Sequence, residues 1–144
     1  MLERLERAVF SVPKHVTQAL EHALSAVESS SSEQALEKNI KAYHAIFQEQ
    51  LRSRGIPSHM LSGVADYVCY GLQPGSFLES VLADEAFKIV VARADNRNLA
   101  ALPIWALVAY NDLPVEGLGN YEAVDRWITM GGLKGKIKRE LDKN

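Results

Sequence analysis

The 144-residue sequence contains little of what several classes of protein require. Its single cysteine, Cys69, excludes an internal disulfide framework and is typical of a reducing compartment. Its apolar runs are all shorter than the ~20 residues that a membrane-spanning helix needs. Its first residues, MLERLERAVF, mix acidic side chains with arginine, unlike a secretory signal peptide. We therefore expect a cytoplasmic protein with no membrane partner.

An excess of charge of one sign is missing as well. The chain has 16 Lys and Arg against 18 Asp and Glu, a formal net charge of −2, whereas nucleic-acid-binding proteins usually carry a basic surface. Residues 60–82 have the outline of helix, glycine turn and helix. The second helix offers Ser76, Glu79 and Ser80 where a recognition helix needs Arg, Lys, Asn or Gln. We expect no sequence-specific nucleic-acid partner, and we interpret the basic tail, residues 133–144, as solvated.

Motifs for metal binding and catalysis are also lacking. None of the four histidines, at positions 15, 22, 44 and 59, lies four residues from another, and no acidic or cysteine cluster completes a zinc site. The segment GGLKGK shares only its Gly-Lys pair with a phosphate-binding loop, because Met130 and Ile137 occupy the other required positions. Cys69 stands between aromatic residues and is expected to be buried and inert. We expect no metal, no cofactor and no catalytic residue, and thus a protein that is not an enzyme.

Strand patterns are nearly absent, and helical spacing extends over most of the chain. Only FKIVVAR, residues 87–93, has the β-branched content of a strand, and it lacks alternation. Apolar residues make up 47% of the chain, enough for a sizeable core at this length. The sequence predicts one all-α domain, a compact bundle of about six to eight short helices. The expected helical ranges are 2–10, 13–28, 33–54, 60–70, 77–82, 84–94, a range ending near 110, and 120–130.

The N-terminal part, residues 1–54, is a candidate for oligomerisation or partner binding. Its last helix, 33–54, has an apolar stripe that includes Tyr43, Ile46 and Phe47 and is wider than one core face needs. The helix at 13–28 is rich in alanine, which permits close approach of another helix. These features predict an interface in a homo-oligomer or with a partner. The alternative is that both stripes close on the chain's own core in a monomer.

A polar segment interrupts the apolar pattern at residues 93–98, within RADNRNLAALPIWALVAYNDLP. Asp95, Asn96 or Asn98 can cap the helix that contains Trp105, and Pro103 fits only its first turn or a kink. We therefore interpret the segment first as a join between two helices. The alternative is an anion site, since two arginines near a helix N-terminus can hold an anion. The candidate ligand- or partner-binding residues are Arg93, Asp95, Arg97, Asn98, Tyr110 and Asn111.

A spaced set of residues over positions 56–132 also carries a resemblance. The set consists of Ile56-Pro57, Gly71-Leu72, Pro74-Gly-Ser-Phe-Leu78, Val81-Leu82, Ala94-Asp95, Asn98, Tyr110-Asn111, Pro114, Gly119, Glu122 and Trp127. It resembles a family of small, uncharacterised helical proteins encoded by phages and prophages, over about half of the chain. Residues 1–54 have no counterpart in that family. The resemblance implies an accessory protein that works in the host bacterial cytoplasm by binding.

Three hypotheses of function follow. The first is a non-catalytic phage or prophage accessory protein that binds and inhibits or modulates a host protein, with anti-phage defence as one target. It predicts an exposed apolar patch on the N-terminal helices. The second is an oligomer that sequesters a small, anionic, nucleotide-like signalling molecule, in a pocket between protomers lined by Arg, Tyr and Asn. The third is a small enzyme of unknown reaction, which needs a pocket with a positioned base.

Overall fold

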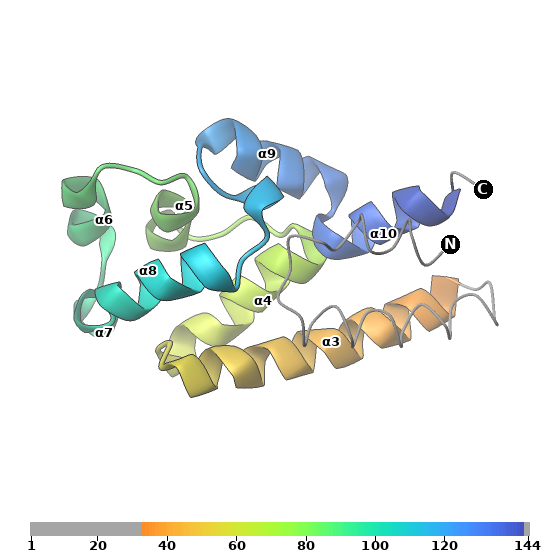
Figure 1. Ribbon diagram of the computed structural model, residues 1–144, viewed down its shortest axis with the longest axis horizontal. Helices are drawn as coiled ribbons and strands as arrows, with labels where there is room; N and C mark the ends of the chain where they lie inside the picture. Colours follow the sequence, from red (N-terminus) through yellow and green to blue (C-terminus); the bar gives the residue numbers. More distant parts are fainter. Residues whose placement is uncertain (1–32, 143–144) are drawn as a thin grey trace.

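The structure is a computed structural model and describes residues 33–142. All regular structure in that range is helical, with eight α-helices, which confirms the predicted all-α class (Figure 1). The expected helices at 2–10 and 13–28 lie outside the described residues. The helices are α3 (Glu33–Arg54), α4 (Leu61–Tyr70), α5 (Ser76–Leu82), α6 (Phe87–Arg93), α7 (Asn96–Ala100), α8 (Leu102–Asn111), α9 (Tyr121–Met130) and α10 (Gly132–Asp142), with 3-10 turns at Ser58–Met60 and Val115–Gly117.

The longest helix, α3, lies along α4 and supplies one side of the core. Its buried residues are Leu36, Ile40, Tyr43, Phe47 and Leu51, which recur at three- and four-residue steps and so share one face. The helix ends at Arg54, and Gly55 then adopts a positive φ of 101°, where a side chain would be strained. Because this face packs on α4, residues 33–54 share one core with the helices that follow them.

The helix α10 packs on α4 where two glycines meet. Gly71, which ends α4 with a φ of 66°, lies so near α10 that a Cβ on it would be 2.6 Å from the backbone nitrogen of Gly132. This segment was expected to be a solvated tail, but Leu133 and Ile137 are buried in it. The four-residue spacing of these side chains gives α10 an apolar face. Its lysines flank this face: Lys138 pairs with Glu33 of α3 at 2.9 Å, and Lys136 pairs with Glu116 of the second 3-10 turn.

Two hydrogen bonds fasten α9 and the second 3-10 turn to α4. The indole Nε1 of Trp127 donates to the backbone oxygen of Tyr67 at 2.8 Å. The hydroxyl of Tyr67 donates in turn to the backbone oxygen of Gly117 at 2.6 Å. All three residues are buried, so these bonds satisfy polar groups that would otherwise be costly inside the core.

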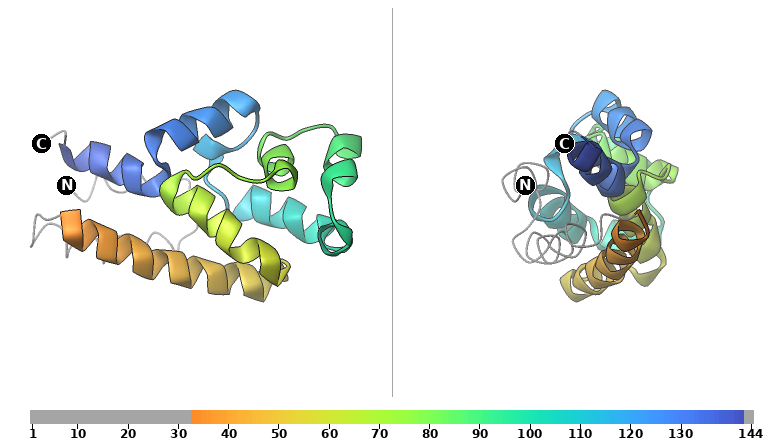
Figure 2. Two further views of the ribbon diagram at one scale, coloured as in Figure 1. Left: turned by 180° about the vertical axis from the view of Figure 1, so that it is seen from behind. Right: turned by 90° about the vertical axis from the view of Figure 1, so that its right-hand side faces the viewer.

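The helices α6 and α7 lie at one end of the described part and α10 at the other, as two opposite views agree (Figures 1 and 2). The segment FKIVVAR is helical, as its lack of alternation indicates. It begins at Phe87 and not at residue 84, because Asp84 adopts a left-handed φ of 54° in the turn after α5. Among residues 33–142 no helix combines the length and the apolar character that a membrane span requires.

Candidate functional site

Two of the candidate binding residues, Asp95 and Asn98, hold the short helix α7 in place between α6 and α8. Asp95 caps α7: one carboxylate oxygen accepts from the backbone N–H of Asn98 at 2.8 Å, and the other lies 2.7 Å from Nε2 of His59. These contacts, the backbone bond first, lower the pKa of Asp95. The Asn98 side chain is buried, and its amide oxygen accepts from the indole Nε1 of Trp105 at 3.2 Å. Both residues therefore hold the fold, and a ligand is not needed to explain them.

The other four candidates divide between the two ends of α8. Arg93 ends α6 and donates to the backbone oxygen of Ser76 at 3.4 Å, and Arg97 is exposed on α7. Tyr110 and Asn111 lie at the far end of the ten-residue α8, which begins beside α7 (Figure 1). A helix of this length spans about 15 Å. The structure thus does not gather the arginines with Tyr110 and Asn111 around one ligand-sized space.

The three candidate interface residues have two different environments. Tyr43 and Phe47 are buried, and their rings stack with centroids 5.8 Å apart. Ile46, between them in sequence, is 50% exposed. The wide stripe of α3 is therefore mostly accounted for by the chain's own core, and Ile46 alone is available to a partner.

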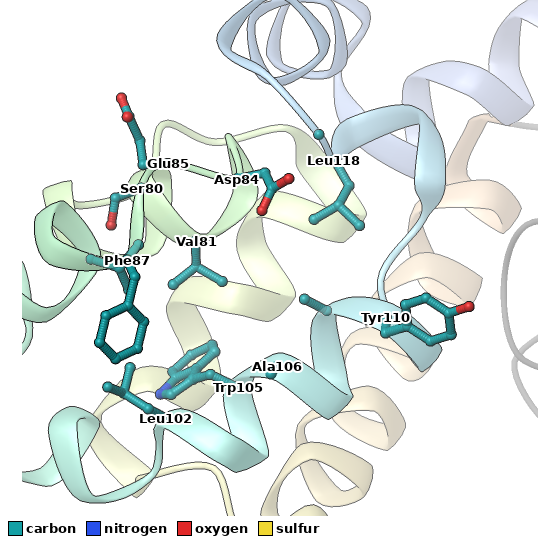
Figure 3. A pocket seen from close by; sticks show the side chains of 13 residues that line it. Ser80, Val81, Asp84, Glu85, Phe87, Leu102, Trp105, Ala106, Tyr110 and Leu118 are labelled. Atoms are coloured by element: carbon teal, nitrogen blue, oxygen red, sulfur yellow. The ribbon is translucent and has the colours of Figure 1, made fainter.

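A groove opens between α5, α6 and α8, and we call it the α8 groove. It has a volume of about 550 Å³, within the range of pockets that take ligands or side chains. Val81 and Trp105 lie at its middle, with Phe87 at one end and Tyr110 at the other (Figure 3). Leu102, Ala106, Ala109 and Leu118 also line it. The lining is thus largely apolar, and its two outer aromatic rings are exposed, Phe87 at 77% and Tyr110 at 87%.

Two of the helices that form this groove, α6 and α8, have apolar side chains that the rest of the described fold does not bury. The helix α8, LPIWALVAYN, is apolar on nearly every side, yet only Trp105 and Val108 are buried in it. The helix α6 contains Phe87, Ile89, Val90 and Val91, and none of its residues is buried. A helix that is apolar all round is normally covered all round. The described part of the chain therefore leaves apolar helix surface without a cover at the groove.

The charged residues that line the groove, Asp84 and Glu85, are both acidic. The Asp84 carboxylate is directed toward Leu118, whereas Glu85 points outward from the rim (Figure 3). Glu85 bonds the hydroxyl of Tyr121, and this contact is the main reason why the pKa of Tyr121 is raised. The left-handed backbone at Asp84 is one that Asp and Asn tolerate better than most residues. The groove is therefore suited to an apolar group beside a cation, and its carboxylates repel an anion.

The groups suited to acid–base chemistry lie elsewhere. His44 Nε2 is 2.7 Å from Asp66, and its other ring nitrogen is 3.0 Å from the Gln48 amide. Cys69 is buried, and this burial raises the pKa of its thiol well above the usual range, as expected for an inert cysteine. Among residues 33–142 no three His, Cys, Asp or Glu side chains form a group that could hold a metal ion. His15 and His22 lie outside the described residues.

The exposed apolar patch was expected on the N-terminal helices, whereas this groove lies between α5, α6 and α8, and most of its residues were missed in the sequence. Tyr110 is the one candidate that lines it; Asp84, Phe87, Ala106 and Ala109 were not singled out for binding. One signal was present, because residues 102–110 are apolar at nearly every position and a short surface helix usually is not. The spacing alone does not say which side of such a helix stays uncovered.

No protein-family model, no curated protein and no solved structure matches this chain. The resemblance of residues 56–132 to phage-encoded proteins is therefore untested and stays a prediction.

Proposed function

We propose that this protein is a non-catalytic binding protein and that the α8 groove takes a segment of a partner protein. The observation that carries the proposal is the incomplete cover of two apolar helices, α6 and α8, on the same side of the fold. Contiguous exposed apolar surface on a water-soluble domain commonly marks an interaction site.

The arrangement of the groove also suits protein recognition energetically. Phe87 and Tyr110 are mostly exposed, and covering such a ring contributes roughly 1.5–3 kcal/mol. Aromatic residues in a pocket that excludes water are frequent hot spots of interfaces. Between them, Ala106 and Ala109 leave room for side chains of the partner. Two large anchors around a shallow centre are what a short protein segment needs for binding.

The identity of the partner rests on the resemblance alone. We propose that the partner is a protein of a bacterial host and that binding inhibits or modulates it in the host cytoplasm, with anti-phage defence as one target. The similarity of residues 56–132 to phage-encoded proteins supports this part of the proposal. The groove is argued from contacts and exposure and does not depend on the resemblance.

The second hypothesis, capture of a nucleotide-like anion, has less support in the described residues. Arg93 and Arg97 do not line the groove, and Asp84 and Glu85 do. An anion placed there would face like charge, which costs binding energy. The third hypothesis, an enzyme, has less support, because no described histidine or cysteine lines the groove, and His44 and His59 are bonded to carboxylates outside it.

The test compares partner capture by three forms of the full chain from a bacterial lysate. Ala106→Arg places a long charged side chain in the groove; Ala42→Arg makes the same change on the exposed side of α3 and serves as the control. Both sites are exposed and helical, and arginine is a good helix former, so both variants should fold. We expect a protein captured by the wild type and by Ala42→Arg but lost with Ala106→Arg. Its affinity is then measured by titration with the purified partner. If everything captured binds Ala106→Arg equally well, the groove is not the binding site.

A further inference from the structure

We propose that the occupant of the α8 groove is a short amphipathic helix of the partner protein, with a lysine or arginine beside its apolar stripe. This inference rests on the proposed function and deepens it, because it names the secondary structure and the charge of the segment that binds.

The length of the groove indicates a helix of about two turns. Phe87 lies beside Leu102 at the start of α8, and Tyr110 stands near its end (Figure 3). Positions 102 and 110 are about 12 Å apart along a helix axis. A helix that binds through positions i, i+3 or i+4, and i+7 spreads its anchors over about 10.5 Å. The two aromatic ends of the groove therefore bracket one such set of anchors.

The centre of the groove permits close approach of a helix. Leu102, Ala106 and Ala109 follow one another at four- and three-residue steps, so they form one row along α8. Small side chains in such a row let the ridges of a second helix enter. Trp105 and Val81 close the floor beneath.

An extended peptide lacks an equivalent reason to bind there. Extended peptides gain much of their affinity from main-chain hydrogen bonds to an exposed sheet edge. The walls of this groove are mainly helices, whose central N–H and C=O groups are bonded within each helix, and among residues 33–142 no strand edge lines it. A partner can therefore gain binding energy here mainly from side-chain packing. A helix suits this because it presents several side chains on one face, at a spacing that matches the groove.

The charge of the groove selects a basic partner. Asp84 is exposed, its carboxylate faces Leu118 at the wall opposite α8, and Glu85 adds negative charge at the rim. Arg93, the arginine that ends the neighbouring α6, is directed to Ser76 and Tyr121 instead. A lysine or arginine next to the apolar stripe of the partner helix would meet Asp84, whereas an acidic residue there would be repelled.

The test is a selection from randomised displayed peptides of about 12 residues, roughly three helical turns, on the full chain. The same selection is repeated on Ala106→Arg. Peptides that bind the wild type but not this variant are called groove-dependent. We expect those peptides to share apolar residues at helical spacing with a lysine or arginine beside them, and to become helical on binding by circular dichroism. Groove-dependent peptides that are extended, or that carry acidic residues at that place, would overturn the inference and leave the proposed function standing. A selection that yields no groove-dependent peptide contradicts both.

The role of Asp84 is tested separately by a double-mutant cycle. Asp84→Asn keeps a residue that tolerates the left-handed backbone and removes the charge. We expect it to weaken a selected basic peptide roughly two- to fivefold and to have no effect on the same peptide with glutamine in place of its basic residue. Glu122→Gln, an exposed change on α9, is the control. Equal effects of Asp84→Asn on both peptides would show that the Asp84 carboxylate does not recognise the positive charge of the peptide.

A cross-linking experiment tests whether the groove is occupied by a second copy of the protein or by another part of the same chain. A photoreactive p-benzoylphenylalanine replaces Lys88, which is exposed on α6 next to Phe87. With a selected peptide added, we expect cross-links to the peptide. Cross-links to a second copy, or to residues 1–32 of the same chain, that persist at saturating peptide would overturn the inference in favour of that occupant.

Discussion

The indole N–H of Trp105 donates to the side-chain oxygen of Asn98 across 3.2 Å, and both residues are almost fully buried. This bond joins α7 to the start of α8 and fixes the floor of the groove, because Trp105 also packs edge-on against Phe77 of α5 with ring centroids 5.4 Å apart. The polar segment at residues 93–98 is thus a structural join between helices. Through Asn98 it fixes the position of the Trp105 side chain.

Replacing Asn98 with alanine should destabilise the protein by about 1–3 kcal/mol, because the buried indole N–H loses its acceptor. Urea unfolding followed by tryptophan fluorescence measures the loss. Asn96→Ala, at an exposed position of the same short helix, is the matched control and should change the free energy of unfolding by less than about 0.5 kcal/mol. Equal effects of the two changes would mean that the Asn98–Trp105 bond contributes nothing specific.

The cap at Asp95 should make stability depend on pH. The backbone N–H of Asn98, and then His59, lower the pKa of Asp95 below its unfolded value of about 3.9. The ionised carboxylate therefore stabilises the fold above that value, and the contribution is lost as the pH falls through the lowered folded pKa. Asp95→Asn should have a lower urea midpoint than the wild type near pH 7, and the gap should narrow at a second, acidic pH below the lowered folded pKa of Asp95. Asp125→Asn, exposed on α9, is the control. A gap that is the same at both pH values would assign the effect to the shape of the cap and not to its charge.

The contact between α4 and α10 should not tolerate a side chain at Gly71. Gly71→Ala places a methyl group 2.6 Å from the backbone of Gly132 and forces alanine into a φ of 66°. The backbone strain alone costs about 1–2 kcal/mol, and the close contact adds to it. Thermal unfolding should show a clear drop in Tm. Gly75→Ala has an ordinary φ of −69° and meets no atom within 4 Å, so it should leave Tm nearly unchanged.

How far the sequence predicts this fold depends on whether a feature is local. The stripe of α3 and the end of that helix near Gly55 follow from periodicity and from glycine, and the structure confirms both. Asp95 is one of three residues proposed to cap the helix that contains Trp105. It does cap a helix, but that helix is the short α7, and α8, which contains Trp105, begins at Leu102 without a side-chain cap. These features depend on neighbours within a few residues, so a pattern in the sequence is enough to find them.

The features that depend on packing were not predictable in the same way. The candidate binding residues were grouped from one stretch of sequence, but within one chain the rigid α8 separates Arg97 from Asn111. Residues 133–142 were expected to be solvated, although Leu133 and Ile137 find a buried place on α4. The α8 groove depends on which side of an apolar helix the rest of the fold covers. The composition of α8 shows that cover is needed but does not show where it is missing.

Removing the aromatic rings at the two ends of the groove should weaken partner binding while leaving the stability of the fold nearly unchanged. Phe87→Ala and Tyr110→Ala remove rings that are 77% and 87% exposed, so each should change the free energy of unfolding by no more than about 0.5 kcal/mol. If these rings are the anchors of an interface, each loss should weaken partner binding by about tenfold or more, which corresponds to a cost of about 1.4 kcal/mol or more. Isothermal titration with the captured partner, beside urea unfolding, measures both quantities on the same samples. Leu72→Ala removes an exposed apolar side chain outside the groove and should change neither. Binding that survives both aromatic changes would show that the uncovered surface of α6 and α8 has another role, because no interface seated in this groove could leave its two largest exposed side chains without effect.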